Sequence, residues 1–273
     1  MMILFEMANN HGGSVATGLK IMNEFAKLKE KYTQFDYAFK FQYRDLDTYI
    51  HPDADEEHRY VKRFKETNLD LRDRHKLKLY AKTLGFTTVC TPFDEKSVQH
   101  AAEHEYDILK IGSPGMYDPH LLTGIHFGWP SYKPVIMSVG GASEQEIDFA
   151  IFTLAREDVI LMHCMSEYPN RYANVGQIGW LSQNYPNNRI GFSSHQDPEE
   201  YIYLPYASVY EFHVCTHPAP NKYSLNAEQM ELVLARLVIE FTQRDPGPKP
   251  VQFMRQKVRG DVMGRWFWKP SGK

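Results

Sequence analysis

The 273-residue chain has few of the features that mark secreted, membrane-bound or nucleic-acid-binding proteins. It contains three cysteines, Cys90, Cys164 and Cys215, an odd number without metal-type spacing. We expect them to be reduced, buried thiols of a cytoplasmic protein. No apolar run approaches the ~20 residues of a membrane span, and we expect no signal peptide before Ile3. Because the net charge is only −3, we expect neither a nucleic-acid nor a membrane partner.

The chain also lacks internal repeats, low-complexity tracts and a glycine-rich dinucleotide fingerprint after its first apolar run. Its apolar segments alternate with stretches of helical periodicity. Eight short apolar segments read as strands, at residues 2–5, 37–42, 87–91, 108–111, 135–139, 159–164, 189–193 and 209–214. Stretches of helical periodicity separate them, at residues 14–32, 57–84 (in two pieces around Asn68), 94–105, 119–125, 144–156 and 175–184, with a helix or turn at 198–204 and a last helix at 227–242.

This count and period predict an α/β fold, a (β/α)₈ TIM barrel over residues 1–243 followed by a tail at 244–273. A doubly wound open sheet is the competing architecture. Polar residues end nearly every strand rather than two or three, which favours the barrel. Residues 43–57 are expected to form a loop, and Ser14 or Asn10, Asp94, Ser143 and Asn226 are expected to cap helices.

The opening stretch, residues 5–13, carries the strongest functional signal. An apolar run breaks at Glu6 into two amides, Asn9 and Asn10, then His11 and two glycines. A polar turn with one capping residue would explain only part of this. A carboxylate at the end of an apolar strand is costly to desolvate, so we favour chemistry over packing.

Polar groups at the other strand ends form a coherent set, because the carboxyl ends of barrel strands converge on one mouth. They are Lys40, Gln42, Thr91, Lys110, Ser113, Ser138, His163, Ser166, Tyr168, Ser194, His195, Glu211 and His213. Lys40 lies between Phe39 and Phe41, so alternation turns it inward, and the same argument applies to Lys110. Two lysines with several hydroxyls would bind a phosphate or carboxylate. His195 and His213 could hold a divalent metal, although each alone could equally be a hydrogen-bonded structural histidine. Four histidines on predicted helices or loops, His100, His104, His120 and His126, are expected at the surface.

Six motifs in order resemble the sialic acid synthase family and span about residues 3 to 226. They are Glu6-Met7-Ala8-Asn9-Asn10-His11-Gly12-Gly13, Phe39-Lys40-Phe41-Gln42, Cys90-Thr91-Pro92-Phe93, Leu109-Lys110-Ile111-Gly112-Ser113, His163-Cys164-Met165-Ser166-Glu167-Tyr168-Pro169 and Gly191-Phe192-Ser193-Ser194-His195. The resemblance implies a barrel that condenses phosphoenolpyruvate with an open-chain sugar aldehyde, using Mn²⁺ or Mg²⁺.

The resemblance also implies roles for individual residues. His195 and His213 would be the metal ligands, the latter from Glu211-Phe212-His213 in place of a Glu-Lys-His motif. Glu6 would serve the proton and water steps. The phosphate and carboxylate of phosphoenolpyruvate would be held by Lys40, Thr91, Lys110, Ser113, Ser138 and Ser166, with Asn10 also in the substrate-binding set. Gln42 and Tyr168 would face the sugar.

Three departures from the family pattern concern the acceptor side. Ser194 replaces an aspartate, and Asn221 or Lys222 stands where an aspartate usually contacts the sugar. We therefore expect N-acetylmannosamine to be a poor substrate and an anionic sugar a better one. We also expect the protein to lack the small antifreeze-like domain that usually follows the barrel, and Arg255 or Arg259 of the basic, aromatic tail to supply its arginine.

The sequence predicts a transferase that makes a 2-keto-3-deoxy sugar acid of the sialic acid kind, for surface glycans such as a capsule polysaccharide. The expected partners are phosphoenolpyruvate and a sugar aldehyde, and the expected state is a homodimer or a domain of a larger protein. Two rivals stay open. One is a Schiff-base aldolase that uses Lys110 or Lys40, and the other is a degenerate barrel without activity inside a polysaccharide-assembly protein.

Overall fold

The computed structural model describes residues 1–200, 202 and 204–242. The chain divides into two compact units, Met1–Glu231 and Leu232–Lys273. The predicted tail at residues 244–273, with Arg255 and Arg259, lies outside the described residues, and so does the predicted boundary at residue 243. In the second unit the described part is the helical segment 232–242, where Arg236 pairs with Glu240 one turn further on.

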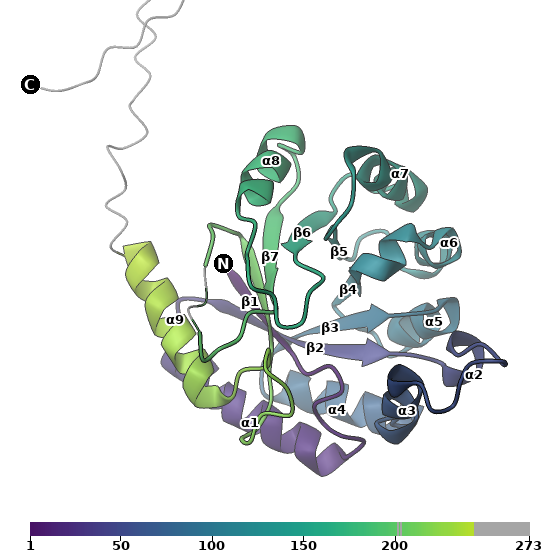
Figure 1. Cartoon of the computed structure of the whole chain (residues 1–273), viewed down its shortest axis with the longest axis horizontal. Coiled ribbons are helices and arrows are strands. Elements are labelled where there is room, and N and C mark those ends of the chain that lie inside the picture. Colours follow the sequence, from purple (N-terminus) through teal and green to yellow (C-terminus); the bar gives the residue numbers. More distant parts are fainter. Residues whose placement is uncertain (201, 203, 243–273) are drawn as a thin grey trace, which may run out of the picture. The chain divides into compact units, whose positions relative to one another are not determined.

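The first unit contains eight parallel strands that close into a barrel in sequence order, as the sequence predicts (Figure 1). Closure in this order excludes the doubly wound alternative, in which the strand order reverses at a switch point. The strands are β1 (Met2–Glu6), β2 (Asp36–Tyr43), β3 (Thr87–Pro92), β4 (Ile108–Ile111), β5 (Val135–Ser138), β6 (Ile160–Cys164), β7 (Ile190–Ser194) and β8 (Val209–His213).

Helices follow the strands, and α1 and α4 to α8 lie outside the ring in Figure 1. Their bounds are α1 (Val15–Lys31), α2 (Leu46–Tyr49), α3 (Arg59–Glu66), α4 (Leu71–Thr83), α5 (Glu95–Glu103), the 3₁₀ helix η1 (Ser113–Tyr117), α6 (Pro119–Gly128), α7 (Glu144–Leu154), α8 (Gly176–Asn184) and α9 (Ala227–Thr242). The predicted break near Asn68 is confirmed. The predicted loop at 43–57 is wrong in part, because Asp45 caps the short helix α2. No helix is found in the described part of 198–204.

The helix starts follow the capping residues read from the sequence. Ser14 Oγ accepts the Thr17 amide at 3.2 Å, and Asp94 Oδ1 accepts the Ser97 amide at 2.7 Å. Ser143 forms a full capping box with Glu146. Asn10, the other candidate cap for α1, has a different role described below. None of the helices in the described part of the chain has the length and apolar character that a membrane crossing requires.

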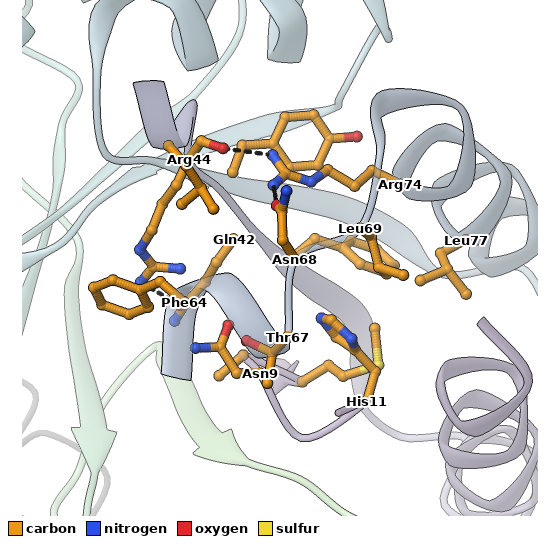
Figure 2. A pocket seen from close by; sticks show the side chains of 15 residues that line it. Asn9, His11, Gln42, Arg44, Phe64, Thr67, Asn68, Leu69, Arg74 and Leu77 are labelled. Carbon is orange, nitrogen blue, oxygen red and sulfur yellow. Dashed lines mark hydrogen bonds between the residues drawn. The ribbon is translucent and has the colours of Figure 1, made fainter. Parts of the chain in front are cut away.

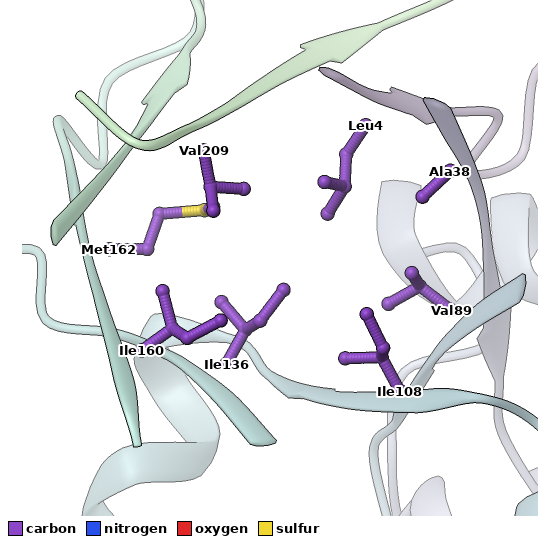
Figure 3. Packing of buried hydrophobic residues seen from close by; sticks show 8 residues of the cluster. All are labelled: Leu4, Ala38, Val89, Ile108, Ile136, Ile160, Met162 and Val209. Carbon is purple, nitrogen blue, oxygen red and sulfur yellow. The ribbon is translucent and has the colours of Figure 1, made fainter. Parts of the chain in front are cut away.

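The barrel interior is built in layers. An apolar layer fills the part of the barrel away from the carboxyl ends of the strands. It consists of side chains from seven strands that point inward: Leu4, Ala38, Val89, Ile108, Ile136, Ile160, Met162 and Val209 (Figure 3). Side chains alternate across a strand, so residues two positions further on also point inward. That step leads from Leu4 to Glu6, from Ala38 to Lys40 and from Ile108 to Lys110. The next layer, towards the carboxyl ends of the strands, is therefore polar.

The turn after β1 is held in an unusual backbone conformation. Ala8 has φ 46° and Gly13 has φ 75°, both in the left-handed region. A Cβ on Gly13 would lie 2.8 Å from the carbonyl oxygen of Glu66, the last residue of α3. Only glycine satisfies both demands, so this turn and the end of α3 are packed together.

Candidate active site

A cavity of about 800 Å³ opens at the carboxyl ends of the barrel strands. Ten of the predicted site residues line it: Lys40, Gln42, Thr91, Lys110, Ser113, Ser138, Ser166, Tyr168, His195 and His213. These residues come from β2 to β8 and the loops that follow them, so the predicted convergence on one mouth is confirmed for this set. Glu6 lies just beneath the cavity surface and is fully buried.

The bottom of the cavity is a cluster of four buried charges, Glu6, Lys40, Lys110 and Glu211, which we call the floor cluster. Glu211 bridges the two lysines: its Oε2 lies 3.1 Å from Lys40 Nζ, and its Oε1 lies 3.0 Å from Lys110 Nζ. Glu6 pairs directly with Lys40. With two ammonium groups and two carboxylates, the cluster is nearly charge-balanced in the absence of a ligand.

Burial and mutual attraction set the ionisation of the floor cluster. Burial raises the pKa of Glu6, and repulsion from Glu211 adds to this, while Lys40 opposes it. Burial alone would raise the pKa of Glu211 too, but Lys110 and Lys40 outweigh it and the pKa falls below its usual range. Burial also opposes the charged form of Lys40, yet Glu211 and Glu6 raise its pKa. Glu211 is thus the firmly ionised carboxylate, and Glu6 is the one closer to taking a proton.

Glu6 is positioned by strand register and by the turn after it. In the ladders of β1, it lies level with Lys40 of β2 on one side and with His213 of β8 on the other. The Ala8 amide donates to Glu6 Oε1, which the left-handed conformation of Ala8 makes possible. The carboxylate is therefore held by the Lys40 ammonium group and the Ala8 amide rather than free to rotate.

Hydroxyl groups surround the two lysines. Lys40 Nζ donates to Thr91 Oγ1 at 3.3 Å, and Ser193 Oγ donates to Glu211 Oε1 at 2.9 Å. The Ser138 hydroxyl is buried and has no hydrogen-bond partner in the described structure. A buried hydroxyl without a partner is costly, so Ser138 is poised to bond to a ligand.

The loop after β5 approaches β6 closely. Ser113 Oγ lies 3.1 Å from Cys164 Sγ, and a Cβ on Gly140 would lie 2.7 Å from the Cys164 carbonyl oxygen. Glycine at position 140 therefore lets Ser113 and Ser138 border the same side of the cavity. All three cysteines are free and buried, as predicted.

The two histidines predicted as metal ligands lie side by side, His195 directly after β7 and His213 at the end of β8. Their ring centroids are 5.3 Å apart, and both rings are almost fully buried. His195 Nδ1 bonds to the Met165 carbonyl oxygen at 2.8 Å, which leaves its Nε2 available. His213 Nδ1 is buried without a partner. The Tyr168 ring covers both, with its centroid 4.1 Å from that of His195.

This pair fits a divalent ion with open coordination positions. Burial lowers the pKa of His195 to about 4 and, together with repulsion between the two rings, the pKa of His213 well below its usual value. Neutral imidazoles are the form that binds a metal, and the Met165 carbonyl fixes the ring orientation of one of them. No group of three or more His, Cys, Asp and Glu side chains with metal-binding geometry occurs among the described residues. Substrate or water would complete the coordination.

Two predicted substrate-binding residues do not line the cavity. Asn10 Nδ2 donates to the Val214 carbonyl oxygen at 2.8 Å and to Ser224 Oγ at 3.0 Å. Asn221 Nδ2 donates to Asn10 Oδ1 at 3.3 Å. Both amides therefore hold the loop after β8 against the turn after β1. Lys222, the predicted extra cation, is exposed and is likewise missing from the lining.

Several side chains that line the cavity are not indicated by the sequence motifs. Arg44, Arg59 and Arg63, which we call the rim arginines, line the outer part of the cavity. Arg44 could have been found by extending the inward alternation of β2 two residues beyond Gln42. Arg59 and Arg63 could not, because only the packing of α3 shows which face borders the cavity. Tyr223 and Ser193 also line it, and the bridging role of Glu211 went unassigned.

A second, small cavity of about 30 Å³ lies behind the rim (Figure 2). His11 and Arg74 border it. The Arg74 guanidinium donates to the Arg44 carbonyl oxygen at 3.0 Å and to Asn68 Oδ1 at 2.6 Å. Arg74 thus ties the end of β2 to the segment between α3 and α4. Burial, with repulsion from Arg74, lowers the pKa of His11 to about 4.

Known proteins resemble this chain over most of its length. An uncharacterised protein of Methanocaldococcus jannaschii is 29% identical over 198 residues, which is 71% of this chain and 55% of that protein. The N-acetylneuraminate-9-phosphate synthase of Drosophila melanogaster is 26% identical over 95% of this chain and 72% of its own length. The crystal structure of a Chromobacterium violaceum protein, described as spore coat polysaccharide biosynthesis protein E, superposes with a TM-score of 0.79 and 36% identity, over 88% of this chain and 75% of that one.

The chain spans little more than half the length of the first of these relatives. The NeuB family profile matches residues 31–236, well over half of the chain and most of the barrel. The resemblance read from the six sequence motifs is thereby confirmed. The chain belongs to the NeuB family.

Proposed function

We propose that this protein condenses phosphoenolpyruvate with an open-chain sugar aldehyde, giving a 2-keto-3-deoxy sugar acid and phosphate. The observation that carries the proposal is the floor cluster beside a neutral histidine pair: two buried ammonium groups bridged by Glu211, next to His195 and His213. The family membership and the fly relative's name, N-acetylneuraminate-9-phosphate synthase, support the same chemistry.

Phosphoenolpyruvate carries a phosphate and a carboxylate, and the polar layer offers donors for both. Lys40 and Lys110 supply two charges, and Thr91, Ser113 and Ser138 add hydroxyl groups on neighbouring strands, with Ser166 on the next loop. Charge-assisted hydrogen bonds of this kind are shorter and stronger than neutral ones. On binding, the ligand's anionic groups would share the ammonium groups with Glu211 and would satisfy the unpaired Ser138 hydroxyl.

Glu6 is proposed to act on the carbon that becomes positively charged. When C3 of phosphoenolpyruvate forms its bond to the aldehyde carbon, the aldehyde oxygen takes a proton and positive charge develops at C2. A carboxylate there stabilises that charge and orients the water that adds to C2. Phosphate then leaves by C–O cleavage, neutralised by Lys40 and Lys110. Because burial raises the pKa of Glu6, the same group can accept the proton that water releases.

A divalent ion, Mn²⁺ or Mg²⁺, would be held by His195 and His213, and it would polarise the aldehyde oxygen for attack. Tyr168 covers the two rings and Gln42 also lines the cavity, which supports the proposal that both contact the sugar. The identity of the metal, a cytoplasmic location, a homodimer and a role in surface glycans stay predictions.

The direct test measures phosphate release from phosphoenolpyruvate with a panel of aldoses, in the presence of Mn²⁺, of Mg²⁺ or of a chelator. We expect release that depends on both the sugar and the metal. Release without any sugar, or none with any member of the panel although phosphoenolpyruvate binds, would contradict the proposal. The second result would favour the degenerate-barrel alternative.

One observation keeps the Schiff-base aldolase as a second candidate. Burial, with repulsion from Lys40, lowers the pKa of Lys110, and a lysine with a lowered pKa is a better amine nucleophile. Its contact with Glu211 at 3.0 Å acts in the opposite direction. Borohydride with pyruvate would trap a covalent adduct on a Schiff-base enzyme, and we expect none.

A further inference from the structure

The outer part of the cavity carries positive charge without a negative partner. Arg44, Arg59 and Arg63 all line it, and none of the three forms an ion pair among the described residues. The floor cluster below is nearly balanced, with two lysines and two glutamates. The uncompensated charge of the cavity therefore lies at its rim.

Helix α3 separates its basic residues by face. Arg59, Tyr60, Arg63 and Phe64 recur at the spacing of one helix face, and these four line the cavity. Lys62 and Lys65 lie on the same helix but are absent from the lining, and they pair with Glu57 and Glu56. Glu56 and Glu57 of the preceding loop are thus paired with the two lysines. They do not neutralise the arginines of α3, which can therefore bind an anionic ligand.

The Arg44 side chain is held in place by two aromatic rings and by Gln42. Its guanidinium carbon lies 3.8 Å from the centroid of the Phe93 ring and 4.4 Å from that of Phe64, so the group is sandwiched between two aromatic faces. Its Nη2 donates to Gln42 Oε1 at 2.7 Å, as Figure 2 shows. Its Nε is buried without an acceptor. Burial lowers the pKa of Arg44 to about 10, which leaves it charged at neutral pH.

The rim is braced from behind. The close approach of Gly13 to the Glu66 carbonyl oxygen packs α3 against the turn after β1, and Arg74 bonds to the Arg44 carbonyl oxygen. Preorganised donors lose less conformational entropy on binding, which favours a specific anion site over a solvated basic surface.

We propose that the rim arginines form a subsite for an oxyanion on the acceptor sugar, a phosphate monoester or a carboxylate at the end remote from the aldehyde. This inference rests on the proposed function, because that function assigns the floor to phosphoenolpyruvate and Gln42 to the sugar. The bond between Arg44 and Gln42 joins the sugar position to the rim. A planar guanidinium matches both oxyanions in a bidentate manner, which a lysine does not.

The test compares three acceptors with the full chain and Mn²⁺: N-acetylmannosamine, its 6-phosphate and the corresponding uronic acid. We expect kcat/KM to be at least tenfold higher for one or both anionic sugars, and the better of the two identifies the oxyanion. Arg44→Gln and Arg63→Gln should each raise the KM of that sugar about tenfold, while the KM for phosphoenolpyruvate stays within about twofold. Lys62→Gln, the same charge change on the other face of α3, should alter neither.

Calorimetric binding of N-acetylmannosamine 6-phosphate and of the uronic acid, each against N-acetylmannosamine, tests the subsite without requiring turnover. If no sugar supports phosphate release but Arg63→Gln still abolishes the preference for an anionic sugar, the subsite stands and the proposed reaction fails. Equal affinity for neutral and anionic sugars would overturn the subsite. So would a rise in the KM for phosphoenolpyruvate in Arg63→Gln, because the rim would then serve that substrate.

Discussion

The cations at the floor of the cavity are paired with carboxylates, whereas those at the rim have no acidic partner among the described residues. At the floor, Lys40 and Lys110 are almost fully buried, and each is paired with a carboxylate. At the rim, Arg59 is exposed, Arg63 is partly so, and neither has an acidic partner among the described residues. Solvent stabilises the unpaired charges of Arg59 and Arg63, whereas burial at the floor requires compensation by carboxylates. Arg44 is the exception at the rim, because it is largely buried, lies between two aromatic rings and donates to Gln42.

Under the proposed function, this difference would separate the binding of the two anionic substrates. Anions at the floor must compete with Glu211 for the lysines, so only a ligand with several acceptor groups gains by binding there. The rim needs no displacement of an internal partner. Substitutions in the floor cluster should therefore affect both folding stability and binding, whereas substitutions of the rim arginines should affect binding alone.

Removing the central carboxylate should have the largest effect. In Glu211→Gln, Lys110 loses its carboxylate and Lys40 keeps only Glu6, so buried positive charge is left uncompensated. We expect a loss of about 3–5 kcal/mol in the free energy of unfolding, measured by urea titration. Glu57→Gln is the surface control, because it breaks only the exposed pair with Lys62 and should cost less than about 1 kcal/mol. Equal losses in the two variants would contradict the distinction between buried and exposed charge.

Removing either histidine should stop turnover while the barrel stays folded. His195→Ala or His213→Ala deletes a proposed metal ligand, and loss of Lewis-acid assistance of several kcal/mol slows the reaction on the order of 10³-fold. His120→Ala, on the exposed part of α6, is the control. The measurements are phosphate release, metal content and thermal unfolding. Full activity of both variants in a chelator would refute the metal-dependent mechanism.

Lys110→Ala tests the floor as a site for phosphoenolpyruvate. A charge-assisted contact to phosphate contributes about 1.5–3 kcal/mol, so the dissociation constant should rise at least tenfold. Calorimetry on the folded variant measures this, with Lys62→Ala as the exposed control. If the variant binds phosphoenolpyruvate as tightly as the parent protein, Lys110 is not part of that site.

The pH dependence of His11 gives the smallest effect. Its pKa in the folded protein is about 4, below the ordinary value near 6.5, so the unfolded chain binds more protons between these pH values. The stabilisation from neutral His11 is therefore fully present above about pH 6.5 and is lost as the pH falls towards 4. We expect the free energy of unfolding to fall by about 2 kcal/mol over that range, through this residue. His11→Asn should flatten the slope, and an unchanged slope would show that other groups cause it.

The sequence predicted the floor better than the rim. Lys40 could be placed inward because Phe39 and Phe41 flank it, and strand alternation leaves no other choice. The same rule places Lys110 inward, whereas Ser138 and the two histidines are expected at the cavity because the carboxyl ends of barrel strands converge there. Two predicted substrate-binding residues, Asn10 and Asn221, do not line the cavity, because they bond to each other and Asn10 also bonds to the backbone just after β8.

Sequence alone determined the barrel, its layers and the cations of the floor, because strand periodicity is local and assigns every residue of a strand to one of two faces. Only the tertiary structure decided which charges meet. Glu211 bridges Lys40 and Lys110 inside the barrel, although it lies over 100 residues from each of them in sequence. Arg59 and Arg63 likewise border the cavity only through the placement of α3, whose last residue, Glu66, packs closely against Gly13. Such contacts depend on the closure of the ring and the packing of loops, which no local pattern encodes.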